Sequence, residues 1–389
     1  MRIETMLDNL IGPERSLSWV LQFWPVLVFS FISALLATSL CKKIALKFGI
    51  VDKPDNLVKT HKGTVAYLGG VGMLAGLTVG ILTGIYGLRD QEHFPLAFRW
   101  LIAVLAGGAI ACLIGLVDDI FDIKPRQKIL GQITAAVVLV LVGIKPALYY
   151  SLTGARIPEN TEVILGIPIV IIFVLGATNS LNLLDGLDGL CAGVTVIITG
   201  AMLLLAIHLG TWGFSEIGGD PVRVIICLAL LGGVCGFLPF NRHPAKIFMG
   251  DAGSMLLGFV IAALMILFAE KIPRWWLASI VVFGLPILDT AVALLRRFIN
   301  KRPLFVSDRG HIYDQMIDRG IPLKRTVAIC YGLAGMYALT GLAMSQIRTR
   351  YALIVYIVVF VVSGIVVWKK GYLKMEGLRG AIRNEPRTN

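Results

Sequence analysis

Long, nearly uninterrupted apolar runs recur from one end of the chain to the other, and they restrict its fold more than any other feature. A run of about 18–20 apolar residues is long enough to cross a bilayer as a helix. Backbone polar groups inside a bilayer must be satisfied within their own segment, so such runs form helices rather than open strands. The sequence therefore predicts an all-α polytopic membrane protein.

Eleven runs are predicted to span the membrane. They are residues 17–40, 67–87, 99–117, 129–148, 163–181, 190–208, 222–240, 255–269, 276–295, 326–345 and 351–368. The fourth is only moderately apolar and the eighth is short, so ten spans remain an alternative. The prediction is a single bundle of about 10–11 helices over 17–368, preceded by an external segment at 1–16 and followed by a basic tail at 369–389.

The distribution of charge predicts how this bundle is oriented. Of the 36 Lys and Arg residues, 25 lie in alternate connecting segments: 41–66, 118–128, 182–189, 241–254, 296–325 and 369–389. Because Lys and Arg accumulate in cytoplasmic loops, these segments are predicted to be cytoplasmic, with the N-terminus outside and the C-terminus inside. The same rule explains the formal net charge of +12 without a nucleic-acid partner. We expect a multi-pass protein of the inner (plasma) membrane.

Composition supports the membrane class and excludes an ordinary soluble domain. The chain is 57% hydrophobic and 15% charged, against roughly 45–50% and about 25% in soluble globular domains. The six cysteines form no CxxC pair, so neither a zinc site nor a disulfide framework is indicated.

Three acids close the third predicted span, in GLVDDIFDIKPRQK at 115–128. Asp118 and Asp119 are adjacent, and Asp122 would share a helix face with Asp118 if the helix continues. Acids at a helix C-terminus oppose the helix dipole, so a plain capping role explains them poorly. Lys128 ends the same stretch. The motif therefore offers oxygen ligands for a cation and a positive charge for a phosphate.

The stretch NSLNLLDGLDGL, residues 179–190, follows the fifth predicted span and carries four polar side chains. Asn179, Asn182 and Asp185 are spaced by three, which places them on a common side of a helix. Asp188 continues this spacing if the helix is not broken before it. Amide and carboxylate oxygens suit Mg²⁺, so the stretch is a candidate metal or phosphate site, with a plain polar end of a span as the alternative.

Two later loops add further candidates. Asp251 lies between two glycines just before the eighth predicted span, where a carboxylate can approach a metal closely, and Lys246 precedes it. The basic loop 301–320 carries Arg309 and His311. Such a loop is suited to holding a phosphorylated sugar, or it serves only as a positive-inside signal.

Two isolated features also carry expectations. Asp289 lies within the ninth predicted span, where an ionisable group is either functional or the partner of a neighbouring helix. In the stretch 150–168, turn residues separate two short β-prone pieces, which predicts a small external hairpin.

All of the polar clusters fall in segments predicted to be cytoplasmic, so several loops are expected to converge on one site. Paired carboxylates, amide oxygens and Lys or Arg at one membrane face suit Mg²⁺-assisted chemistry on phosphates with one substrate in the lipid.

The order of these motifs resembles that of the polyprenyl-phosphate N-acetylhexosamine-1-phosphate transferases, glycosyltransferase family 4. The resemblance covers 17–345, and it includes VDKPDNLVKTHKGTVAYLGG at 51–70 as well as DDIFDIK, NSLNLLDGLDGL, PAKIFMGDAGS and DRGHIYD. It implies a helical bundle around a cytoplasmic cleft, and a homodimer as the expected assembly. It also implies transfer of a sugar 1-phosphate from a UDP-sugar to a polyprenyl phosphate such as undecaprenyl phosphate. UMP is released, and the reaction is the first membrane step of cell-envelope polysaccharide synthesis.

The resemblance assigns catalytic and metal-binding roles residue by residue. Asp251 matches the family's magnesium-binding acid, and Asn182 lies where part of the family uses an amide ligand. The implied cofactor is Mg²⁺, with Mn²⁺ as a second candidate. Asp118 and Asp119 match the paired acids, one of which acts on the lipid phosphate. The choice between these two stays open.

The remaining matched positions are expected to contact substrate. They are Asp122, Lys128, Asn179, Asp185, Asp188, Lys246, Arg309 and His311. Of these, Lys128 and Lys246 would hold phosphates. Arg309 with His311 would lie near the nucleotide sugar.

One departure from the family pattern leaves the donor sugar open. The branch that uses UDP-N-acetylglucosamine has His-x-His-His in the last loop, whereas this chain reads HIYD at 311–314. N-acetylglucosamine 1-phosphate with undecaprenyl phosphate is the main expectation. Another UDP-N-acetylhexosamine, or a UDP-muramoyl-pentapeptide, is the alternative donor.

Two other classes of protein fit less well. CDP-alcohol phosphatidyltransferases also have Asp-rich motifs at the membrane edge, but DGLDGLCAG lacks their Ala-Arg pair. An ion-coupled transporter would use Asp118, Asp185 and Asp289 as ion sites. Transporter sites lie near the bilayer midplane, whereas most of these acids are predicted at one edge.

Overall fold

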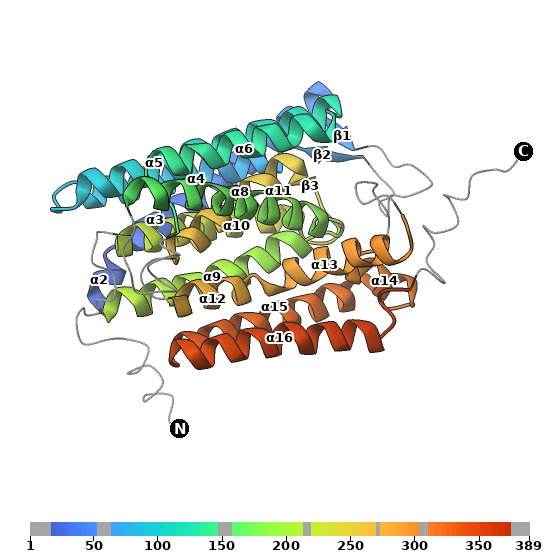
Figure 1. The fold of residues 1–389 in the computed structure, drawn as a ribbon. Coiled ribbons are helices and arrows are strands. Elements are labelled where there is room, and N and C mark those ends of the chain that lie inside the picture. Colours follow the sequence, from blue (N-terminus) through green and yellow to red (C-terminus); the bar gives the residue numbers. More distant parts are fainter. Residues whose placement is uncertain are drawn as a thin grey trace, which may run out of the picture.

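The computed structural model describes residues 17–52, 64–146, 158–212, 219–269, 273–302 and 310–374, and most of them are helical (Figure 1). The helices are α2 (Leu17–Leu21), α3 (Trp24–Phe48), α4 (Gly69–Leu88), α5 (Phe94–Phe121), α6 (Pro125–Leu141), α8 (Glu159–Leu184), α9 (Leu190–Thr211), α10 (Gly219–Asn241), α11 (Gly250–Leu267), α12 (Pro273–Val282), α13 (Gly284–Ile299), α14 (Ile312–Asp318), α15 (Leu323–Ser345) and α16 (Thr349–Lys369). The strands are β1 (Val51–Asp52), β2 (Val65–Tyr67) and β3 (Ile247–Phe248).

The predicted all-α polytopic membrane protein is confirmed. In the described part of the chain, nine helices are long and apolar enough to cross a bilayer on their own: α3 (counted from Ser18), α4, α5, α8, α9, α10, α11, α15 and α16. Helices α12 and α13 together form a tenth, bent by 66° between them. Helix α6 has 17 residues, at the lower limit of spanning length. Without α6, the described residues contain nine spans, or ten with the bent pair, against the ten or eleven expected.

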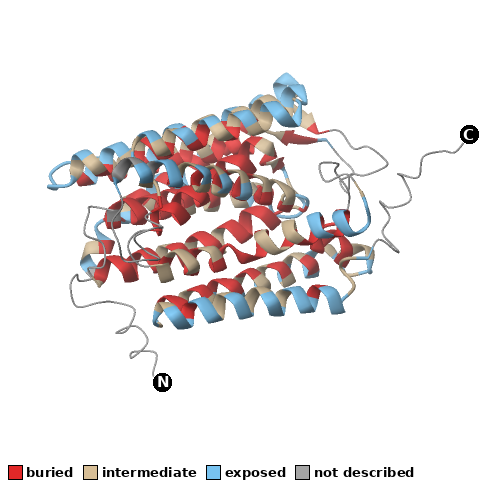
Figure 2. Ribbon diagram, in the orientation of Figure 1, coloured by how far each residue is buried: buried red, intermediate tan, exposed pale blue. Residues whose placement is uncertain are grey.

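Burial divides the bundle into a centre and a rim (Figure 2). Helix α11 is central: 94% of its apolar 18-residue stretch is buried, because α4, α5, α8 and α10 pack around it. The corresponding stretch of α16 is more hydrophobic, yet only 11% of it is buried. A helix that is apolar on all sides must be covered either by protein or by lipid. Helix α11 is covered by protein, whereas most of the α16 surface is left uncovered by this chain.

The elements that carry the polar motifs reach the same end of the bundle. A small sheet there has the order β1–β2–β3, with β1 antiparallel and β3 parallel to β2, and it sets Tyr67 beside Phe248. Figure 1 shows this sheet and α14 at one end, and α2 at the other. The expected convergence of the polar loops is therefore present among the described residues, at what we call the sheet end.

The structure departs from three expectations about element boundaries, two of which depended on a helix continuing. Helix α5 ends at Phe121, and Asp122 takes a left-handed conformation (φ 49°), so Asp122 and Asp118 do not share a helix face. Helix α8 ends at Leu184, so Asp188 lies in the turn before α9. The second piece of the predicted hairpin is the start of α8, because its apolar residues continue into the membrane run. Residues 150–157 lie outside the described part.

Candidate active site

The N-terminus of α11 is held by a carboxylate from α5. Asp119 accepts hydrogen bonds from the backbone N–H groups of Asp251 (2.9 Å) and Ala252 (3.1 Å). Gly250 has φ +68°, and a Cβ there would overlap the Asp119 carboxylate, so glycine is required. First-turn N–H groups have no partner within their helix, and a negative charge is favourable beside them. Asp119 thus fixes the position of Asp251.

A lysine joins two of the predicted catalytic acids. The ammonium group of Lys128, in α6, donates to Asp118 Oδ2 (3.0 Å) and to Asp251 Oδ2. Asp118 also accepts from the backbone N–H of Ile123 (3.1 Å). The side chains of Lys128 and Asp118 are 16% exposed and that of Asp251 is 29% exposed, so the cluster is open to a ligand. The ammonium charge offsets the repulsion between the two carboxylates.

Asn182 completes the contacts of the Asp251 carboxylate. Its Nδ2 donates to Asp251 Oδ1 (2.7 Å) and to Ser254 Oγ (3.0 Å). One oxygen of Asp251 is therefore held from α8 and the other from α6. In this arrangement Asn182 orients the carboxylate, because its amide donor, not its carbonyl oxygen, is turned toward Asp251.

Asp185, at the C-terminal end of α8, adds a further negative charge. Burial raises the pKa of Asp185 well above its ordinary value, and the charges of Asp251 and Asp119 raise it further. Carboxylates that oppose one another's ionisation form a site that a cation would stabilise. We refer to Asp118, Asp119, Asp185 and Asp251 as the site acids.

Tyr67, on β2, has surroundings that the sequence did not reveal. Burial raises the pKa of Tyr67, and the charges of Asp52 and of three site acids raise it further. Its ring packs edge-on against Phe248, with centroids 5.9 Å apart. The stretch 51–70 was already part of the family resemblance. However, one aromatic residue on a three-residue strand has no periodicity to distinguish it.

Asn179 lies one helical turn before Asn182 but has different partners. Its Nδ2 donates to Gln132 Oε1 on α6 (3.0 Å) and to the carbonyl of Leu175 (2.8 Å). Asn179 thus joins α8 to α6. The equal spacing in sequence did not indicate this difference, because it depends on which neighbouring helix faces each turn.

Asp188 lies beyond the end of α8 and contacts the loop between α10 and β3. Its Oδ2 accepts from the backbone N–H of Ala245 (3.0 Å) and lies 2.8 Å from His243 Nδ1. Asn241 supports the same junction, because its Oδ1 accepts from the backbone N–H of Gly189 (3.2 Å). The α8–α9 turn is therefore tied to the loop that leads into β3.

His311 lies inside the protein. It is 5% exposed, and its Nδ1 is 2.8 Å from Oδ2 of Asp289, whose Oδ1 accepts from the backbone N–H of Ile312 (2.7 Å). Burial lowers the pKa of His311, but the hydrogen bond and charge of Asp289 outweigh it and raise the pKa overall. Of the two roles considered for Asp289, the structure favours the partner of a neighbouring segment. The geometry gives no support to direct contact between His311 and a nucleotide sugar.

The other predicted positions are peripheral or undescribed. Asp122 and Lys246 are exposed at the sheet end, and neither belongs to the hydrogen-bonded cluster around Asp251. Arg309 lies outside the described residues.

The cluster has the composition of a magnesium site shared with a substrate. Among the described residues, no three His, Cys, Asp or Glu side chains form a ready-made metal cage. Mg²⁺ is usually held by one or two carboxylates together with substrate phosphates, not by protein ligands alone. Asp251 and Asp118 match this pattern, and the ammonium group between them shows that the position accepts a cation. The donor set therefore fits Mg²⁺.

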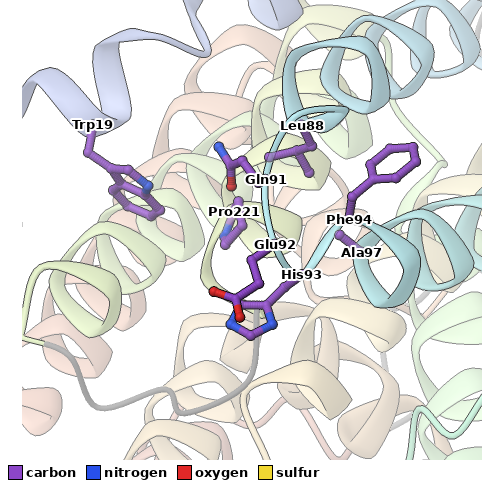
Figure 3. A pocket seen from close by; sticks show the side chains of 8 residues that line it. All are labelled: Trp19, Leu88, Gln91, Glu92, His93, Phe94, Ala97 and Pro221. Carbon is purple, nitrogen blue, oxygen red and sulfur yellow. The ribbon is translucent and has the colours of Figure 1, made fainter.

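A cavity at the opposite end of the bundle is separate from this cluster. It has a volume of about 290 Å³, and Trp19, Glu92, His93, Phe94 and Pro221 are among the residues that line it (Figure 3). None of the site acids lies in its wall. The cavity and the cluster of site acids therefore lie at different ends of the bundle.

The fold and the site together define a polytopic membrane protein with a cluster of acids and a lysine at the sheet end of its helical bundle. Residues 101–269 match the family described as Glycosyl transferase family 4. The chain is 30% identical over 351 residues to the decaprenyl-phosphate N-acetylglucosaminephosphotransferase of Mycobacterium tuberculosis, covering 85% of this chain and 84% of that protein.

Two further relatives extend the comparison. The probable undecaprenyl-phosphate N-acetylglucosaminyl 1-phosphate transferase of Bacillus subtilis is 29% identical over 91% of this chain and 92% of its own length. The phospho-N-acetylmuramoyl-pentapeptide-transferase of a Geobacillus species is 29% identical over 76% of this chain and 89% of its own length. The chain belongs to glycosyltransferase family 4, the polyprenyl-phosphate N-acetylhexosamine-1-phosphate transferases, as its motifs predicted, and it is a transferase.

Proposed function

We propose that this protein transfers N-acetylglucosamine 1-phosphate from UDP-N-acetylglucosamine to a polyprenyl phosphate such as undecaprenyl phosphate, with release of UMP. The product would be the first lipid-linked intermediate of a cell-envelope polysaccharide. The observation that carries the proposal is the Lys128 bridge between Asp118 and Asp251 at the end of a membrane bundle. This arrangement suits two phosphate substrates, one of which comes from the lipid.

The chain's own residues have distinct parts in such a transfer. The lipid phosphate would attack the sugar-bearing phosphorus of the donor, which brings several negative charges together. Lys128 would neutralise part of that charge. Asp118 is the better candidate to orient or deprotonate the lipid phosphate, because it shares Lys128 with Asp251, whereas Asp119 holds two backbone N–H groups of α11. Preorganised charges of this kind are commonly the largest contribution to catalysis.

A divalent cation fits the same arrangement. Asp251, oriented by Asn182, would hold Mg²⁺ together with substrate phosphates, with Asp118 as a second carboxylate within reach of the same lysine. When bound, Mg²⁺ would supply charge neutralisation for the diphosphate and for UMP as it leaves. Mn²⁺ is the second candidate for this position.

The relatives and the charge pattern support the proposed donor and location. The relatives that cover most of this chain carry N-acetylglucosaminyl transferase names, which supports that donor. The muramoyl-pentapeptide transferases also align, so their donor is the runner-up. The basic connecting segments support a cytoplasmic site at the inner membrane, where UDP-sugars are available. We also propose a homodimer, as the family resemblance implies.

The test is a donor panel with the full-length protein in nanodiscs. UDP-N-acetylglucosamine, UDP-N-acetylgalactosamine and UDP-muramoyl-pentapeptide would each be supplied with undecaprenyl phosphate and Mg²⁺. Release of UMP and radiolabelled lipid would be measured. We expect equal amounts of UMP and lipid product with UDP-N-acetylglucosamine, and no product when EDTA replaces Mg²⁺. Absence of UMP with every donor would overturn the proposed reaction, whereas product from another donor alone would change the sugar.

A further inference from the structure

The turn between α8 and α9 carries two of the predicted site residues, and tyrosine hydroxyls hold it at both ends. The Tyr313 hydroxyl donates to the carbonyl of Leu183 (2.7 Å). The Tyr331 hydroxyl donates to the carbonyl of Gly189 (2.7 Å). Leu183 lies in the last turn of α8, where carbonyls have no partner within the helix, so a side chain from another element can decide the path of the turn that follows. The Gly189 carbonyl also accepts from the backbone N–H of Gly193 (2.9 Å), so Tyr331 contacts the start of α9.

Both tyrosines pack against glycines. A Cβ at Gly186 would overlap the phenol ring of Tyr313, and a Cβ at Gly193 would overlap that of Tyr331. Gly186 therefore adjoins Tyr313, and Gly193, just after this stretch, adjoins Tyr331. Gly189 has φ +77°, which favours glycine for its backbone, whereas Gly186 leaves room for an aromatic ring.

Tyr313 is itself fixed from the other side. Its ring is nearly parallel to that of His311, with centroids 5.5 Å apart and an angle of 9°. The imidazole of His311 is in turn held by Asp289. A continuous series of contacts thus runs from Asp289 on α13, through His311 and Tyr313, to the last turn of α8, where Asn182 contacts Asp251.

We propose that Tyr313 and Tyr331 are positioning residues of the transferase site. Neither hydroxyl contacts a site acid; each holds one end of the segment 183–189, which carries Asp185. Tyr313 occupies the third position of HIYD, where the family branch described above has a histidine. This inference rests on the proposed function for its kinetic part, but the conformation of the turn can be measured without substrate.

The experiment removes one hydroxyl at a time from the full-length protein in nanodiscs. Tyr313→Phe and Tyr331→Phe are compared with Tyr337→Phe. Tyr337 is a matched control, because it is buried on the same helix as Tyr331, and its hydroxyl bonds to Ser363 Oγ on α16 (2.6 Å) instead of to the turn. The measurements are amide hydrogen exchange of peptides covering 183–193, kcat, KM for both substrates, and the thermal unfolding midpoint.

We expect faster exchange in the turn for Tyr313→Phe and Tyr331→Phe, and not for Tyr337→Phe. We expect kcat to fall roughly tenfold in the first two variants, with KM changed by less than about twofold, because a lost hydrogen bond displaces groups that act in the transition state. The unfolding midpoints of all three variants should be lowered to a similar extent. Gly186→Ala is a second variant, which displaces the Tyr313 ring without altering the tyrosine.

Unchanged exchange in 183–193 for both Tyr313→Phe and Tyr331→Phe would overturn the inference. A loss of activity without faster exchange would also overturn it, since the hydroxyls would then act directly on substrate. If the wild-type protein shows no transfer with any donor, the proposed function fails, and the exchange measurement still decides whether the tyrosines hold the turn.

Discussion

At the scale of single residues, the site is organised around Asp251. One of its carboxylate oxygens contacts Asn182 and the other contacts Lys128, while Asp119 holds its backbone. Chemistry alone singled out these residue types, since carboxylates, amides and lysines are unusual at the edge of an apolar chain. Their pairing was not predictable, because it depends on how four helices, α5, α6, α8 and α11, pack against one another.

Asp251→Asn is predicted to reduce turnover by about two orders of magnitude or more, because the substitution removes the charge at the centre of the preorganised cluster. The protein should still fold, since loss of one acid relieves repulsion among the others. The measurement is UMP release together with the elution profile of the purified protein. Asp90→Asn is the control, because Asp90 is an exposed acid in the loop that carries Glu92 and His93, at the opposite end of the bundle. Near-normal turnover in Asp251→Asn would remove Asp251 from the site.

Asp119 and Asp118 are predicted to differ in their effect on stability. Asp119→Ala leaves two N–H groups of the first turn of α11 without their partner, which should cost about 1–3 kcal/mol. Asp118→Ala should cost less, because it leaves one backbone N–H group, that of Ile123, without its acceptor instead of two. Thermal unfolding of both variants in the same detergent tests this difference. Equal midpoints would contradict the assignment of Asp119 as the residue that holds α11.

At the scale of elements, helix ends decided which predicted residues reach the site. The spacing of Asp118 and Asp122, and of Asp185 and Asp188, assumed that a helix continued through each motif. Helix α5 instead ends with Asp122 in a left-handed conformation, and α8 ends before Asp185. Local sequence specifies the interior of a helix better than its last turn, because tertiary contacts compete for the unpaired groups there.

The segment that begins α14 should make stability depend on pH. The pKa of His311 is raised in the folded protein above its ordinary 6.5. A raised folded pKa means that the pair with Asp289 contributes fully below pH 6.5, and that this contribution is lost as pH rises through the folded pKa. The unfolding midpoint of the wild type, measured relative to His311→Gln, should therefore fall as the pH is raised above 6.5. A difference that stays constant or grows with pH would contradict the prediction.

At the scale of the whole molecule, the two ends of the bundle have different character. The sheet end has the site acids and Lys128, whereas the opposite end has the cavity lined by Glu92 and His93 (Figures 1 and 3). The number of crossings can be predicted from the length and hydropathy of each segment, because the thickness of the bilayer sets how long an apolar helix must be. Which helices pack against each other cannot be predicted in this way, because lipid and protein interiors are similarly apolar.

Membrane orientation can be tested by cysteine labelling from one side. Arg126→Cys places a thiol at the sheet end, and His93→Cys places one at the opposite end; both positions are exposed. A membrane-impermeant maleimide added to intact cells should label His93→Cys and leave Arg126→Cys unlabelled until the cells are opened. The wild-type chain, with its six cysteines, gives the background. The reverse pattern would show that the predicted orientation is wrong.

The sequence by itself determined the membrane class, the approximate spans and the residue types of the site. The length of an apolar run and the charge of a connecting segment are local properties, which do not depend on the rest of the fold. Only the tertiary structure decided that Asp119 holds α11, that His311 is buried against Asp289, and that Tyr313 and Tyr331 hold the turn between α8 and α9. These are pairings between distant segments, and their energies exist only once the helices have packed.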